Sequence, residues 1–220
     1  REYTYGDDLR RIAWYQVAKS PERKLFIIER EEEKRKEFKI LMPLFETLFE
    51  GEEGARKIDY ISEALIAFSG LMVRINTILD IVILANTQVI NFKIKKQNDL
   101  YKLIKFFGEV EIKRFKNEYI KILEENPEIY SGSPLLLISD RGLSKIGLEI
   151  LKKIREKNGI EVILVETINK NNLKNPIIKL IQKYDNIELE KLKYKLNLIR
   201  INPIICKNDK ILEELIKIFN

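Results

Sequence analysis

The chain has 220 residues, of which 45% are hydrophobic, and its 40 basic and 34 acidic residues leave a net charge of +6. This composition supplies a full core for one large domain with a small appendage, and it excludes an intrinsically disordered chain. The sequence contains no histidine, which excludes Ser-His-Asp and Cys-His catalysis and removes the commonest general base near neutral pH.

Strand-like and helix-like segments alternate through most of the chain, which predicts an α/β fold with a mainly parallel sheet. The expected strands are 38–45, 79–85, 88–94 as the hairpin partner of 79–85, 135–139, 160–167 and one within 187–201. The expected helices are 58–75, 99–107, 111–126, 143–157, one near 172–184 and 209–219. The region 1–34 does not alternate in this way. We therefore expect an N-terminal appendage, 1–34, that packs against a sheet domain, 35–220.

A charged cluster near the start, GDDLRRIAW at residues 6–14, holds two acids, two arginines and a tryptophan. One of the acids is placed to cap a short helix that begins near Leu9, because carboxylates favour the positive end of a helix. Trp14 is expected to anchor this segment on the sheet domain through the apolar area it buries. We interpret the cluster as a structural network of ion pairs. The alternative is a docking surface, in which Arg10 or Arg11 meets an acidic partner.

The basic excess is densest within residues 93–121. It includes Lys95, Lys96, Lys102, Lys105, Lys113, Arg114 and Lys116. A stripe of this kind can meet nucleic acid, in which case binding falls steeply with salt. No aromatic ladder alternates with these lysines as in a base-stacking platform. We interpret the stripe as a solvated helix face and keep a nucleic-acid-binding domain as the alternative function.

Residues 1–38 carry an extended motif. It consists of an arginine and a tyrosine, then Gly-Asp-Asp, a hydrophobic residue, Arg-Arg-Ile, a tryptophan, a small residue before a basic one, and an acidic run. In this pattern the chain resembles the von Willebrand factor A-like family catalogued as domain of unknown function number 58. The family usually has aspartate where this chain has Ala13. The matching residues are Arg1, Tyr3, Gly6, Asp7, Asp8, Leu9, Arg10, Arg11, Ile12, Trp14, Ala18, Lys19 and Glu31 to Glu33.

The resemblance implies a von Willebrand A-type fold, a doubly wound and mostly parallel sheet with helices on both faces. Genes of this family often lie beside genes for MoxR-type AAA+ ATPases. The role that the resemblance implies is to assist such an ATPase in assembling, activating or remodelling other proteins.

The resemblance also makes a metal site testable in the sequence. Von Willebrand A domains that bind a divalent metal use Asp-x-Ser-x-Ser at the end of the first strand, with a later threonine and aspartate. Counted forward from the acidic run, these five positions fall on residues 43–47, so that Pro43 replaces the aspartate, Phe45 the first serine, and Thr47 alone keeps a hydroxyl. Asp140 remains at the later aspartate position. One carboxylate and one hydroxyl are too few ligands for Mg²⁺, even with Glu46 as a stand-in.

We therefore expect a degenerate metal site and no cofactor. Asp140 is expected to serve instead as the cap of the helix that follows it, worth about 1 kcal/mol. The expected function is a non-enzymatic protein-protein interaction module, an adapter that works with a MoxR-type AAA+ ATPase or its client. A metal-dependent hydrolase is the third and least favoured reading. The candidate partner-binding residues are Arg10, Arg11, Trp14, Glu46, Thr47 and Asp140.

The single cysteine, Cys206, excludes an internal disulfide and indicates a reducing compartment. We expect it to be a buried thiol. The sequence has neither a transmembrane stretch nor a signal peptide, so we expect a cytoplasmic protein. Because the chain begins at Arg1 rather than at methionine, we expect it to be a fragment. The alternative localisation is a membrane tether through a segment before Arg1.

Overall fold

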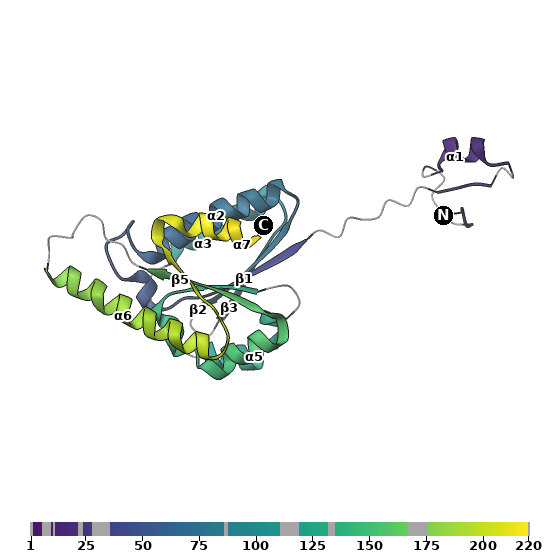
Figure 1. The fold of residues 1–220 in the computed structure, drawn as a ribbon. Coiled ribbons are helices and arrows are strands. Elements are labelled where there is room, and N and C mark those ends of the chain that lie inside the picture. The colour runs from purple at the N-terminus through teal and green to yellow at the C-terminus, as the bar shows by residue number, and fades with distance from the viewer. Residues whose placement is uncertain are drawn as a thin grey trace. The chain divides into compact units, whose positions relative to one another are not determined.

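The chain divides into two compact units, Arg1–Lys34 and Arg35–Asn220 (Figure 1). Each unit is described by itself. The computed structural model describes residues 2–5, 10, 12–21, 24–27, 36–85, 88–110, 119–131, 135–166 and 176–219, without the side chains of 176–179 and 181.

The first unit is held by an antiparallel bridge between Ile12 and Ile27. Ile12, Ala13 and Ile27 are its buried apolar side chains among the described residues. The helix α1 (Trp14–Lys19) follows the bridge directly. The helix start predicted near Leu9 lies outside the described residues; Arg10 is in a 3₁₀ turn, Ile12 is in the extended bridge, and the regular helix begins at Trp14.

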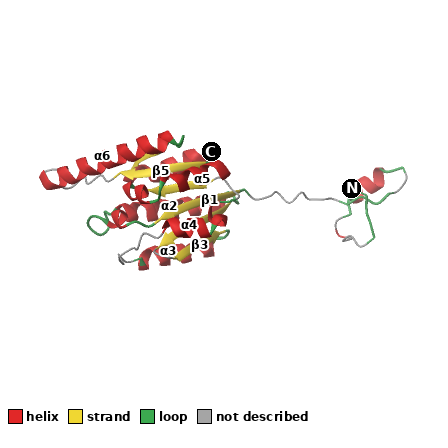
Figure 2. Ribbon diagram, turned by 90° about the horizontal axis from the view of Figure 1, so that it is seen from below, coloured by secondary structure: helices red, strands yellow, loops and turns green. Residues whose placement is uncertain are grey.

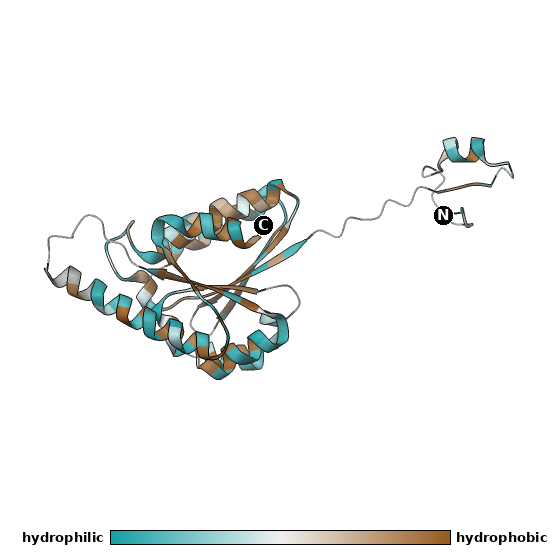
Figure 3. Ribbon diagram, viewed as in Figure 1, coloured by the Kyte–Doolittle hydropathy of each residue, from teal (hydrophilic) through white to brown (hydrophobic). Residues whose placement is uncertain are grey.

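The second unit is built on a six-stranded sheet with the strand order β3-β2-β1-β4-β5-β6. Neighbouring strands are parallel except for β2 and β3, which form the predicted antiparallel hairpin. The central strands are near-continuous apolar runs, as expected of strands covered on both faces (Figure 3). The strands are β1 (Glu37–Pro43), β2 (Ile78–Ala85), β3 (Gln88–Ile94), β4 (Leu135–Ser139), β5 (Ile160–Glu166) and β6 (Ile204–Lys207).

Helices cover both faces of this sheet and divide the core in two (Figures 1 and 2). One half of the core lies beneath α2 (Lys57–Arg74), α3 (Gln97–Glu109) and α7 (Ile211–Phe219). The other half lies beneath α4 (Tyr119–Glu125), α5 (Leu148–Asn158) and α6 (Pro176–Leu198). This arrangement confirms the predicted fold class, a doubly wound and mostly parallel α/β sheet with helices on both faces.

Short 3₁₀ helices connect several of these elements. They are η2 (Glu46–Phe49), η3 (Pro127–Tyr130), η4 (Arg141–Lys145) and η5 (Asn208–Lys210). The helix predicted over 143–157 is in fact two elements, η4 and α5. The backbone of Gly147 departs from helical geometry, with φ of 3° and ψ of 135°, and α5 begins only after it. A residue without a Cβ accommodates such a break most easily.

The largest correction concerns α6, which runs without interruption to Leu198. A helix near 172–184 followed by a strand within 187–201 is therefore wrong. The strand comes later, as β6, and it contains Cys206, whose thiol is buried as expected. Residues 111–118, the first half of the helix predicted over 111–126, lie outside the described residues, as do 167–175.

No helix in the part of the chain that the structure describes is both long enough and apolar enough to cross a membrane.

Candidate functional site

The candidate site lies where the carboxyl ends of β1 and β4 meet. These two strands are parallel neighbours in the middle of the sheet. The helix that follows β1 covers one face of the sheet, and the helix that follows β4 covers the other. The chain therefore changes direction at this point, which is where open α/β sheets place their ligands.

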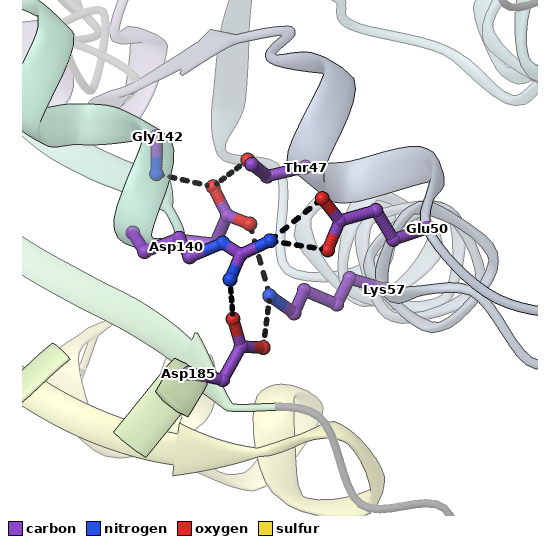
Figure 4. A network of polar contacts seen from close by, with 7 residues as sticks. Thr47, Glu50, Lys57, Asp140, Gly142 and Asp185 are labelled. Carbon is purple, nitrogen blue, oxygen red and sulfur yellow. Dashed lines mark hydrogen bonds and ion pairs between the residues drawn. The ribbon is translucent and has the colours of Figure 1, made fainter. Parts of the chain in front are cut away.

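A buried lysine occupies this place. Lys57, the first residue of α2, places its Nζ 3.0 Å from Oδ2 of Asp140 and 3.1 Å from Oδ2 of Asp185 (Figure 4). The three side chains are at most 4% exposed. Since each carboxylate is desolvated, each requires a nearby cation: Lys57 pairs with both, and Asp185 also pairs with Arg141. One cation thus joins the start of α2, the end of β4 and the middle of α6.

Asp140 is bonded through both of its carboxylate oxygens. Its Oδ1 accepts from Oγ1 of Thr47 at 2.7 Å and from the backbone N–H of Gly142 at 2.9 Å, while Oδ2 accepts from Lys57. The bond from Gly142 makes Asp140 the cap of η4, which is the capping role expected from the sequence. Asp140 also contacts Thr47, so two predicted residues from distant parts of the chain meet here (Figure 4).

Arg141 extends the network toward solvent. Its Nη2 donates to both carboxylate oxygens of Glu50 at 2.6 Å, and its Nη1 forms an ion pair with Asp185. Burial is the strongest single influence on the pKa of Arg141 and lowers it, but the hydrogen bond from Glu50 and the charges of the surrounding carboxylates raise the pKa above its ordinary value. The guanidinium therefore stays charged and ties η4 to α6.

Pro43 and Phe45, the residues predicted to stand in place of a metal-binding aspartate and serine, are part of the core. Pro43 ends β1 in a buried position, and Phe45 is fully buried. The ring of Phe45 packs edge-on against Tyr119, with centroids 5.0 Å apart. A Cβ at Gly142 would lie 2.5 Å from Cγ of Phe45, so the ring fills the space beside η4.

Tyr119 lies under this loop and donates its hydroxyl to the backbone carbonyl of Leu44. Burial, with a smaller contribution from the charge of Glu46, raises the pKa of Tyr119 to about 12. The phenol is therefore a neutral donor at physiological pH. It fixes the backbone directly before the exposed Glu46.

The remaining predicted residues are in the first unit. Trp14 is 66% exposed, and Arg10 is described, whereas Arg11 and the residues Gly6 to Leu9 lie outside the described part of the chain. The capping role of an aspartate near Leu9 and the anchoring role of Trp14 remain predictions.

The donor set at the edge does not fit a divalent cation. Such an ion requires about six oxygen ligands. The two buried carboxylates that the structure describes here, Asp140 and Asp185, are already held by the ammonium of Lys57, which lies between them, and Glu50 is bonded to Arg141. Within the described residues no three acidic or cysteine side chains gather in a way that could hold a metal ion.

The lysine stripe predicted over 93–121 does not form one face among the described residues. Lys102 and Lys105 are exposed on α3, which covers one face of the sheet, whereas Lys121 is on α4, which covers the other. Lys93 forms an ion pair with Glu37 at 3.1 Å. Lys113, Arg114 and Lys116 lie outside the described residues.

Sequence reasoning missed Lys57, Asp185, Arg141 and Glu50. Lys57 is separated by 83 residues from Asp140 and by 128 from Asp185, and no local spacing announces such pairs. The sequence did contain one indication of the ion pairs of Lys57. A lysine in the first turn of a helix opposes the helix dipole, and such a residue needs a nearby carboxylate to be stable there.

No protein-family model matches the chain, and no curated protein matches it either. Among solved structures, the chain is similar to the conserved hypothetical protein BatB from Bacteroides thetaiotaomicron, with a TM-score of 0.47 and 11% sequence identity. The alignment covers 82% of this chain and 95% of that chain. At this level of similarity, neither site residues nor function are carried over.

Proposed function

We propose that the chain is a non-enzymatic protein-protein interaction module whose carboxyl edge is held by an internal lysine instead of a metal ion. The observation that supports this proposal best is the ammonium of Lys57, which lies buried between Asp140 and Asp185. These three residues contact one another, and the two aspartates also contact Thr47, the backbone N–H of Gly142 and Arg141. The Thr47 hydroxyl donates to Asp140, whose carboxylate is also held by Lys57 and by the backbone N–H of Gly142, so these bonds hold the loops in place.

The partner binds the exposed rim of this edge. Glu46 is exposed, and the carboxylate of Glu50 is half-exposed beside Arg141. Both residues belong to the loop that the network and Tyr119 fix from below. A rigid acidic rim favours a basic surface on the partner, since complementary charges speed association and exclude wrong partners.

In the more specific form of the proposal, the chain is an adapter for a MoxR-type AAA+ ATPase. This form rests on the resemblance of residues 1–38 to the family named above. The first unit then supplies a second contact through Arg10, Arg11 and Trp14. No feature of the described residues favours the nucleic-acid alternative, because the lysines that suggested it are divided between two faces.

The test is capture of partners from the native lysate on the immobilised chain, read by mass spectrometry. We expect an AAA+ ATPase to be recovered equally with and without EDTA and nuclease. Glu46→Lys is expected to weaken capture, whereas Glu109→Lys, an exposed carboxylate at the end of α3, leaves capture unchanged. Loss of the ATPase with EDTA contradicts a metal-free edge, loss with nuclease contradicts the protein contact, and its absence from every eluate rejects the adapter role.

Metal addition provides a separate prediction. Millimolar Mg²⁺ is expected to leave the melting temperature unchanged, because a ligand stabilises a protein only where the folded state binds it. The measurement is thermal unfolding in EDTA and across a magnesium titration. A saturable rise of several degrees would show that the edge binds the ion despite Lys57.

A further inference from the structure

Helix α6 has apolar side chains on two opposite sides. Its inner side chains, Leu189, Leu192 and Leu196, are buried against the sheet. On the outer side, five large apolar side chains are 45–72% exposed. They are Leu180, Tyr184, Ile187, Tyr194 and Leu198. We call these five residues, together with the exposed Lys191 among them, the outer stripe.

The spacing of the outer stripe indicates what covers it. Its six positions alternate intervals of four and three residues from Leu180 to Leu198. This is the a/d repeat of a coiled-coil seam, in which each side chain inserts between residues of a facing helix. Helices that lie on a membrane surface present a broader apolar face with a basic opposite side. The inner side of α6 is instead packed in the core.

The order of residues along the outer stripe makes it complementary to itself. When two copies are placed antiparallel, Leu180 of one faces Leu198 of the other, and Tyr184 faces Tyr194. At the centre, Ile187 faces the aliphatic stem of Lys191, whose exposed ammonium donates to Glu188 of its own chain at 2.9 Å. Every position thus meets a counterpart, as a two-fold symmetric interface requires.

The exposed area agrees with a dimer of moderate affinity. Large apolar side chains present about 150–250 Å² each, so five that are 45–72% exposed offer roughly 600 Å² on each copy. This matches the largest apolar patches found on monomers, about 300–600 Å², which mark interaction sites. Two copies would bury about 1,200 Å², the lower limit of specific interfaces.

We propose that the chain forms a symmetric dimer through antiparallel pairing of the outer stripes of α6. The dimer goes beyond the proposed adapter role and does not depend on it.

The first experiment measures mass against concentration for the full chain by sedimentation velocity. We expect a monomer–dimer equilibrium with a dissociation constant on the order of 10 µM, as an interface of this size supports. Tyr194→Glu places a charge in the outer stripe and is expected to weaken the dimer at least tenfold. Tyr101→Glu changes a tyrosine on α3 of almost equal exposure and is expected to leave the dimer intact.

The second experiment tests the antiparallel arrangement by cysteine cross-linking. A mixture of Leu180→Cys and Leu198→Cys chains, treated with a short bis-maleimide, is expected to give a covalent heterodimer, whereas each variant alone gives none. The native Cys206 does not interfere, because it is 2% exposed and burial raises the pKa of its thiol to about 11.

Three results would overturn the proposal. A chain that stays monomeric up to several hundred micromolar has no such interface. A dimer that survives Tyr194→Glu uses another surface. Cross-linking of the Leu198→Cys variant with itself indicates parallel helices.

Discussion

The ammonium of Lys57 is buried, and its two ion pairs hold the carboxyl edge of the sheet together. A buried cation between two carboxylates is poor evidence of added stability, since desolvation offsets much of the attraction. The role of this cation is to fix the positions of the elements around it. Because Asp140 and Asp185 come from β4 and α6, the ammonium fixes two elements relative to the start of α2.

Lys57→Met tests this role with a side chain of similar length and no charge. We expect the free energy of unfolding to fall by about 3–5 kcal/mol, because the buried Asp140 loses its ion pair and Asp185 is left with Arg141. Urea unfolding measures the loss. The matched control is Lys121→Met, which removes an exposed lysine 3.8 Å from Glu125 and should change stability by less than about 0.5 kcal/mol. Equal stability of Lys57→Met and the wild type would mean that the carboxylates do not depend on the lysine.

Gly142→Ala tests the packing of Phe45 against η4. The new methyl would approach the ring to 2.5 Å, and we expect a loss of about 1–3 kcal/mol from overpacking. Gly70→Ala in α2 is the control, since a Cβ there meets nothing within 4 Å. This control is expected to gain about 0.5–1 kcal/mol from the better helix propensity of alanine. Chemical denaturation of both variants measures the difference, and a neutral Gly142→Ala would show that Phe45 moves aside easily.

The sequence predicted only part of the candidate site. Thr47 and Asp140 were both singled out as positions of the metal-binding motif that the resemblance implies, and the structure joins them by a hydrogen bond. Lys57 and Asp185 could not be paired in advance, since their contact depends on how α2 and α6 pack across the edge. Long-range ion pairs leave no local pattern.

At the scale of whole elements, apolar runs predicted the strands well because the central strands are covered on both faces. The strand predicted within 187–201 failed for a physical reason. In α6, Leu192 and Leu196 of the inner side interleave with Tyr194 and Leu198 of the outer side. Two helical stripes on opposite sides of one helix together give apolar residues at every second position, which imitates a strand.

Asp99, in the first turn of α3, is expected to make a pH-dependent contribution to the stability of the fold. Asp99 accepts from the backbone N–H groups of Lys95 at 3.0 Å and Lys96 at 3.1 Å. These bonds, the one from Lys95 most, hold the pKa of Asp99 below its ordinary value. A lowered carboxylate pKa stabilises the folded state above the ordinary value of about 3.9, and the contribution is lost as the pH falls through the folded value.

Asp99→Ala is therefore expected to cost about 1 kcal/mol at pH 7, the usual value of a helix cap. As the pH falls below about 3.9 the difference from the wild type should shrink, and it should vanish only below the lowered pKa of Asp99 in the folded state, where the carboxylate is protonated in both states of the wild-type chain. Urea unfolding at several pH values measures the gap. Glu109→Ala at the other end of α3 removes an exposed pair with Lys105 and serves as the control. A gap that stays constant down to pH 3 contradicts the role of the charge.

At the scale of the whole molecule, the unit Arg35–Asn220 contains all six strands and both halves of the core. A unit with its own core is expected to fold alone. A chain of residues 35–220 should therefore unfold in one cooperative step, within a few degrees of the full-length melting temperature. Differential scanning calorimetry of both chains checks this. A broad or much earlier transition would show that residues 1–34 complete the fold.

The two outermost strands of the sheet have a consequence for solubility. β6 is only four residues long and ends in a lysine, and β3 carries Lys93, paired with Glu37 of β1. Short and charged border strands are poor templates for further chains, and in this way sheet proteins avoid growth into fibrils. At protein concentrations where self-association begins, the described part of this molecule is therefore expected to form closed, finite assemblies and to resist the seeding of amyloid.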